Sequence, residues 1–172
     1  MFKNKSIQAL STTKAYYWYS FLLCIGLLGF AIFLQTVVML APCPLCELQR
    51  LMFLIIAFLS LLGGLVNPGR KGVLWFSFFI ALFAILGALL AGHQLWLERH
   101  PPPNPDACGM GLSYLFSVLP VSQALKVAIM GTGDCATVTW RLLGLSIPVW
   151  SFGAFILLLL ISIYQVCRSS RP

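Results

Sequence analysis

The sequence has very few charged residues. Only 9% of its 172 residues are Asp, Glu, Lys or Arg, and just four of these are acidic, whereas 60% are hydrophobic. A soluble domain of this size has too much surface to cover with so few charges, so the composition indicates an integral membrane protein. The net charge of +7 does not indicate nucleic-acid binding, because the basic residues stand in ones and twos with no long basic run.

Several sequence signatures are also missing. There is no internal repeat and no low-complexity segment. No G-x-G-x-x-G motif follows a strand pattern, which argues against a nucleotide cofactor. The sequence therefore gives no reason to expect a dinucleotide-dependent enzyme.

What the sequence does contain is four long apolar runs. They cover about residues 16–40, 48–66, 73–97 and 147–166, and a spanning helix needs about 20 such residues. Backbone groups in hydrocarbon must bond within their own segment, so these runs predict helices. We expect an all-α, integral membrane four-helix bundle that forms a single domain over residues 1–172.

The first apolar run could instead be a secretory signal, since lysines precede it and "LAPC" resembles a lipoprotein cleavage box. Signal cores have only about 7–15 apolar residues, and cleavage requires a small residue before the cut. Pro42 occupies that position here, so we interpret the run as a retained helix.

The basic residues favour one orientation in the membrane. Four spans put both termini and the turn "NPGRKG" on one side. That side carries seven basic residues and no acidic one: Lys3, Lys5, Lys14, Arg70, Lys71, Arg168 and Arg171. The other side carries four of each sign: Arg50, Arg99, Lys126 and Arg141, with Glu47, Glu98, Asp106 and Asp134. The positive-inside rule then predicts cytoplasmic termini and outward-facing loops at about 41–47 and 98–146.

Four of the six cysteines fall in these two outer loops. Cys43 and Cys46 share the short loop, and Cys108 and Cys135 share the long one. Disulfides persist outside the cytoplasm, and the favoured pairs are Cys43–Cys46 and Cys108–Cys135, although four cysteines allow three connectivities. A Cys43–Cys46 bond closes almost no loop, so it would stabilise little and indicates redox chemistry. Cys108–Cys135 could equally be a structural bond across the loop.

Other chemistry for the cysteines is less favoured. Haem attachment requires His after the second cysteine, where this chain has Glu47. A four-cysteine zinc site usually has a second close pair, which Cys108 and Cys135 do not provide. No metal site is predicted, and Cys24 and Cys167 are most simply small apolar residues.

Arg50 and His93 are candidates for binding a ligand beside the cysteine pair. Cys46 is expected in the first turn of the second helix, where the helix dipole favours a thiolate. Arg50 follows four residues later on the same face, so it could lower the pKa of that thiol or donate to a ligand oxygen. The alternative is an arginine that reaches the interface. A lipid-soluble carrier such as a quinone could reach this pair, with His93 in its pocket. The alternative for His93 is a capped or solvated histidine, and Trp96 is better explained by the interfacial aromatic belt.

The long outer loop contains the segment "PVSQALKVAIM". Its apolar residues Val121, Leu125 and Ile129 recur every four positions, while Ser122, Gln123 and Lys126 are polar. This spacing predicts a short amphipathic helix, which we expect to lie on the membrane surface.

The motifs in combination resemble the bacterial disulfide bond formation protein B (DsbB) family. The resemblance extends over nearly the whole chain and rests on "CPLCELQR", "AGHQLWLE", "PDACGMGLSYL", "GTGDCA" and "WRLLGLSIPVWS", in that order. It implies a quinone-dependent thiol oxidase of the inner membrane whose outer loops face the periplasm.

The resemblance also implies roles for individual residues. Cys108 would form a mixed disulfide with a periplasmic, DsbA-like thioredoxin-fold oxidase, and Cys135 would be its partner. Electrons would pass to Cys43–Cys46, and Cys46 would engage the quinone, either ubiquinone or menaquinone. Arg50 matches the arginine that supports quinone binding. His93 stands where many relatives have arginine.

Two other functions are open to a sequence of this kind. One is a quinone reductase of the vitamin K epoxide reductase type, although its C-x-x-C is expected near the third or fourth helix. The other is a non-enzymatic membrane scaffold with structural disulfides.

Overall fold

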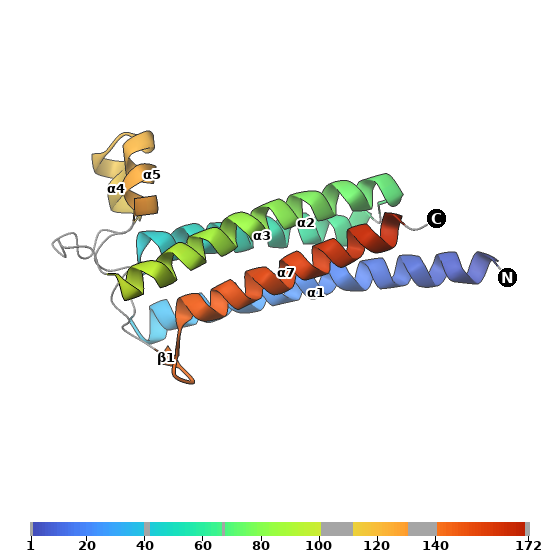
Figure 1. Cartoon of the computed structure of the whole chain (residues 1–172), viewed down its shortest axis with the longest axis horizontal. Coiled ribbons are helices and arrows are strands. Elements are labelled where there is room, and N and C mark those ends of the chain that lie inside the picture. Colours follow the sequence, from blue (N-terminus) through green and yellow to red (C-terminus); the bar gives the residue numbers. More distant parts are fainter. Residues whose placement is uncertain (1, 40–41, 67, 101–111, 131–140, 171–172) are drawn as a thin grey trace.

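The computed structural model describes residues 2–39, 42–66, 68–100, 112–130 and 141–170. Four long helices run side by side: α1 (Phe2–Val37), α2 (Pro44–Val66), α3 (Arg70–Arg99) and α7 (Ile147–Ser170). Each contains a segment that is long and apolar enough to cross a membrane. The predicted all-α architecture with four candidate spans is therefore confirmed (Figure 1).

The helices extend beyond most of the predicted spans. For example, α2 begins at Pro44 and α3 ends at Arg99, because an apolar run marks what fits in hydrocarbon while helical hydrogen bonding continues into the interface. The end of α1 is the exception. It lies at Val37 rather than at about residue 40, and Met39 follows in the left-handed conformation with φ 56°, which is a common way to end a helix.

The core of the bundle is apolar and tightly packed. Phe53 of α2 and Phe155 of α7 stack with ring centroids 4.0 Å apart, and both are buried. Small residues of α3, such as Ala84, Gly87 and Ala88, are buried beside them. Small residues allow membrane helices to approach closely, so α3 supplies the surface on which the two aromatic rings sit.

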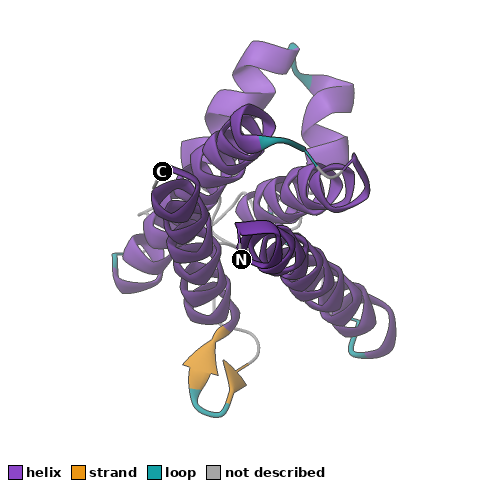
Figure 2. Ribbon diagram, turned by 90° about the vertical axis from the view of Figure 1, so that its right-hand side faces the viewer, coloured by secondary structure: helices purple, strands orange, loops and turns teal. Residues whose placement is uncertain are grey.

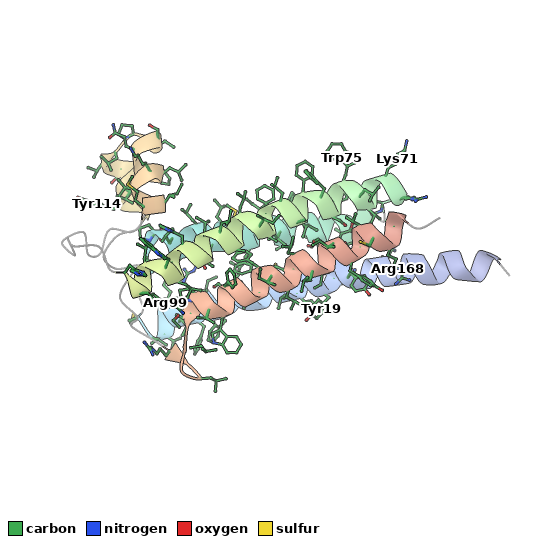
Figure 3. The ribbon with its side chains drawn as sticks, in the orientation of Figure 1. Tyr19, Lys71, Trp75, Arg99, Tyr114 and Arg168 are labelled. Atoms are coloured by element: carbon green, nitrogen blue, oxygen red, sulfur yellow. The ribbon has the colours of Figure 1, made fainter. Side chains whose placement is uncertain are left out.

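The outer surface of the bundle is also apolar. Large exposed side chains occur along all four helices, for example Leu22, Phe58, Leu89 and Leu160, each more than half exposed. Figure 3 shows such side chains pointing away from the ribbon along its length. An apolar belt of this extent would be unfavourable in water, so it fits a lipid environment.

The two ends of the bundle differ. In Figure 1, α1 begins and α7 ends at the same end, and Lys71 and Arg168 lie there in Figure 3. At the opposite end lie α4 (Leu112–Val118), α5 (Val121–Met130) and a hairpin of β1 (Arg141–Leu142) and β2 (Leu145–Ser146). Figure 2 shows the hairpin projecting to one side of the helices. The sequence did not predict α4 or the hairpin.

The expected helix at residues 121–130 is present as α5. Its buried residues are Ala124 and Ala128, which pack against Leu48 of α2 and Leu115 of α4. The predicted apolar residues Val121, Leu125 and Ile129 are exposed. The apolar face of α5 is therefore directed outward, and its small residues make the contact with the bundle.

Candidate active site

The C-x-x-C pair lies at the N-terminus of α2, at the end of the bundle near α4 and α5. Cys43 Sγ is 2.8 Å from Cys46 Sγ, whereas a disulfide bond is about 2.05 Å long. Cys43 is buried and Cys46 is half-buried. A small movement of either side chain is enough to form or break a bond between the two sulfurs.

The start of α2 explains this geometry. Cys43 immediately precedes the helix, its carbonyl accepts a 3.0 Å hydrogen bond from the Glu47 amide, and Pro44 takes the first helical position, which suits a residue without an N–H. The Cys46 amide donates a 3.3 Å hydrogen bond to Cys43 Sγ. The partial positive charge of the helix N-terminus therefore favours a thiolate at Cys43 as well as at Cys46. The sequence predicted this only for Cys46.

Two buried glutamines lie beside the pair. Gln94 of α3 donates from Nε2 to Cys46 Sγ at 3.3 Å and to Cys43 Sγ at 3.5 Å. Gln49 of α2 donates from Nε2 to Gln94 Oε1 at 2.8 Å. Each side chain is only 4% exposed. The two sulfurs thus face a fixed carboxamide on one side, while Leu45 and Leu97 form an apolar cluster with the cysteines.

Sequence reasoning did not identify these glutamines. One signal was available, because polar side chains within membrane helices are costly and are frequently functional. Gln49 comes three residues after Cys46, which places it on the same side of α2. The position of Gln94 beside the sulfurs depends on how α3 packs against α2, and no spacing within one helix reveals that.

Arg50 lies one turn beyond Cys46, as its spacing predicts, and its guanidinium contacts α1. Nη1 donates to Gln35 Oε1 at 2.6 Å, and Nη2 donates to the Ala31 carbonyl at 3.1 Å. Arg50 is half-buried and Gln35 is exposed. The arginine therefore connects the helix that carries the cysteines to α1 near the surface of the bundle.

His93 precedes Gln94 on α3 and is half-buried. Its ring stacks on Trp96 with centroids 6.1 Å apart, and Trp96 also stacks on His100 at 5.0 Å. Within the described residues, His93 Nε2 is buried without a hydrogen-bond partner. A buried ring nitrogen of this kind is suited to a ligand oxygen. Trp96 is exposed, as an aromatic-belt residue would be.

The remaining cysteines divide into two groups. Cys108 and Cys135 lie outside the described residues. Cys24 is fully buried in the helical core, and Cys167 is exposed near the end of α7. In the part of the chain that the structure describes, no group of three or more His, Cys, Asp or Glu side chains could hold a metal ion.

Comparisons with known proteins agree with the resemblance found in the motifs. The family model described as disulfide bond formation protein DsbB matches residues 13–165. Disulfide bond formation protein B of Hahella chejuensis is 43% identical over 145 residues, which cover 84% of this chain and 88% of that protein. The Marinobacter nauticus protein of the same name is 41% identical, over 88% and 90% of the two chains. Disulfide bond formation protein B 1 of Pseudomonas aeruginosa is 37% identical, over 92% and 98%.

Proposed function

The chain belongs to the disulfide bond formation protein B (DsbB) family, and from this premise we propose that it is a quinone-dependent thiol oxidase of the bacterial inner membrane. In this role it reoxidises a periplasmic, DsbA-like thioredoxin-fold oxidase. The single observation that carries the proposal is the close approach of Cys43 Sγ and Cys46 Sγ, 2.8 Å apart, at one end of a bundle of apolar helices. A C-x-x-C pair in that position can accept electrons from the water side and pass them to a carrier in the lipid.

The electron path follows from thiol–disulfide exchange. A thiolate of the reduced partner attacks the Cys108–Cys135 disulfide and forms a mixed disulfide at Cys108. The partner's second thiol then attacks that bond and leaves Cys108 and Cys135 reduced. One of these sulfurs attacks Cys43–Cys46 in the same way, because each transfer needs a thiolate and an accessible disulfide.

The last transfer goes to the quinone. Cys46 is the sulfur that engages it, and Cys46 is more exposed than Cys43. The Cys43–Cys46 bond reforms as an electron pair and two protons convert the quinone to the quinol.

Arg50 and His93 are the residues of this chain that we assign to quinone binding. Arg50 is held at the α1–α2 contact by Gln35 and Ala31, and a guanidinium can donate to a quinone oxygen. His93 offers a buried ring nitrogen at the same end of the bundle as Cys46.

In the membrane, we place both termini in the cytoplasm and the C-x-x-C end in the periplasm. The seven basic residues on the terminal side support this orientation. The outward apolar residues Val121, Leu125 and Ile129 of α5 support contact between that helix and the bilayer surface.

The test is a quinone assay with purified protein in lipid nanodiscs. Reduced DsbA-like protein is added together with ubiquinone or menaquinone, and quinone absorbance is followed. The proposal expects stoichiometric conversion of quinone to quinol and of the partner's dithiol to its disulfide. Absence of quinone consumption by protein whose four outer cysteines are intact would refute it.

A further inference from the structure

We propose that Gln94 is a catalytic hydrogen-bond donor to the sulfurs of the Cys43–Cys46 pair, and that Gln49 is a positioning residue that fixes its carboxamide. The proposal deepens the function proposed above and rests on it, because it concerns thiol–disulfide chemistry at the same cysteines.

The donor role follows from the contacts of Gln94. Its amino group carries two N–H bonds, and its Nε2 lies 3.3 Å from Cys46 Sγ and 3.5 Å from Cys43 Sγ. A single amide group can therefore serve both sulfurs. Because Gln94 is only 4% exposed, water competes little for these bonds, and hydrogen bonds to a charged acceptor are stronger in such surroundings.

Gln49 decides which end of the carboxamide faces the sulfurs. A glutamine amide turned around would place Oε1, an acceptor, against them and would disfavour a thiolate. Gln94 Oε1 accepts a 2.8 Å hydrogen bond from Gln49 Nε2 and a much longer one, at 3.8 Å, from Cys46 Sγ, so Gln49 holds the oxygen farther from that sulfur than Nε2, which is 3.3 Å away. The amino group of Gln94 is thereby directed toward Cys43 and Cys46.

The chemical step shows where the donor acts. When a thiolate attacks Cys43 Sγ of the Cys43–Cys46 disulfide, a new S–S bond forms to Cys43 and the bond to Cys46 breaks. The electron pair of the broken bond leaves on Cys46 Sγ, which becomes a thiolate without taking a proton. Gln94 Nε2 is the donor 3.3 Å from that sulfur, so it stabilises the reduced form and lowers the pKa of the leaving thiol.

Other titratable groups at this end of the bundle also affect the thiols, and the variants below leave all of them unchanged. In the described residues they are Glu47 and Arg50 on α2, His93, Glu98, Arg99 and His100 on α3, Tyr114 on α4, Lys126 on α5, and Arg141 on β1. A difference between wild type and a glutamine variant therefore reports on the carboxamides.

The experiment measures the pH dependence of alkylation of Cys43 and Cys46 by iodoacetamide in the full chain, with Cys108 and Cys135 replaced by Ser. Gln94→Met keeps the side-chain volume and removes the donors. We expect it to raise the midpoint pH of alkylation by about one unit, a tenfold change in the acid dissociation constant of the thiol. Gln94→Glu moves it further, because it adds negative charge. Gln49→Leu raises it less, because Gln94 stays in place but is no longer oriented.

A second measurement is the equilibrium of the pair with dithiothreitol. Gln94→Met should make reduction about tenfold less favourable, equivalent to a potential about 30 mV more negative for a two-electron couple. The matched control is Gln165→Met. Gln165 is also buried, at 5% exposure, but accepts a hydrogen bond from Ser77; its replacement should change stability and leave both readouts unchanged.

The outcomes separate the two proposals. Unchanged midpoints in Gln94→Met and Gln49→Leu, or an equal shift in Gln165→Met, would show that the glutamines only connect α2 to α3. Neither readout requires quinone or a protein partner. Failure of the wild-type quinone assay would refute the proposed function while leaving the pKa effect measurable.

Discussion

Arg50 donates a 2.6 Å hydrogen bond from Nη1 to Oε1 of Gln35, 15 residues earlier in the chain. A second bond, from Nη2 to the Ala31 carbonyl, holds the guanidinium against α1. The guanidinium is therefore held at the contact between α1 and α2, and a ligand that enters between these helices meets its charge.

Arg50→Met is expected to raise the KM for quinone by about 10- to 100-fold, because a hydrogen bond to a charged group contributes roughly 1.5–3 kcal/mol. The fold should remain, since Met keeps most of the buried stem. The measurement is a quinone titration at saturating reduced partner. Gln35→Leu, which removes one anchor of the guanidinium, should raise the KM by a smaller factor.

Arg99→Met is the matched control for this arginine. Arg99 is exposed at the end of α3 (Figure 3) and has no assigned role. The KM of the Arg99→Met variant for quinone should therefore equal that of the wild type. An unchanged KM in Arg50→Met would discard the assigned role of Arg50 in quinone binding.

Cys46→Ser is expected to abolish turnover with quinone while the protein stays folded. The serine hydroxyl cannot form the disulfide, so the electron pair has no route from Cys43 to the carrier. Quinone consumption and thermal unfolding are measured on the same preparation. Cys167→Ser, at an exposed position near the end of α7, should retain wild-type turnover. Wild-type quinone turnover in Cys46→Ser would contradict the oxidase and would favour a scaffold without catalytic function.

The sequence predicted the membrane helices because the bilayer leaves little choice. Residues 73–97 are apolar and long enough to span, and a helix is the structure that satisfies their backbone. The neighbours of the cysteines were less accessible. Gln94, which contacts Cys46, lies on α3 and is 48 residues later in the chain. Arg50 contacts Gln35 on the preceding helix, α1. Both contacts depend on the register between packed helices, which no periodicity within one segment encodes.

His93→Phe tests whether the buried ring nitrogen of His93 takes part in quinone binding. Phe keeps the stacking on Trp96 but removes Nε2, which is buried without a partner in the described residues. We expect a KM for quinone raised several-fold, with little change in stability, because an aromatic ring replaces an aromatic ring. His93→Arg, which restores a donor, should recover most of the affinity.

His100→Phe is the control for His93, since His100 also stacks on Trp96 but is exposed. Its KM for quinone should match the wild type. Equal KM values for His93→Phe and wild type would remove His93 from the quinone site and leave it as a packing residue of α3.

Gly87→Ala tests the close approach of α3 and α7 in the core. A Cβ at Gly87 would overlap the ring of Phe155, and Phe155 cannot move aside easily because it is fully buried and stacked on Phe53. Overpacking of this kind costs about 1–3 kcal/mol, so the variant should unfold at a lower temperature in detergent. Gly153→Ala on α7 is the matched control, since a Cβ there meets nothing within 4 Å, and its stability should stay within about 0.5 kcal/mol of wild type. Equal unfolding temperatures for Gly87→Ala and Gly153→Ala would mean that Phe155 has room to shift and that its stack on Phe53 does not depend on a glycine in α3.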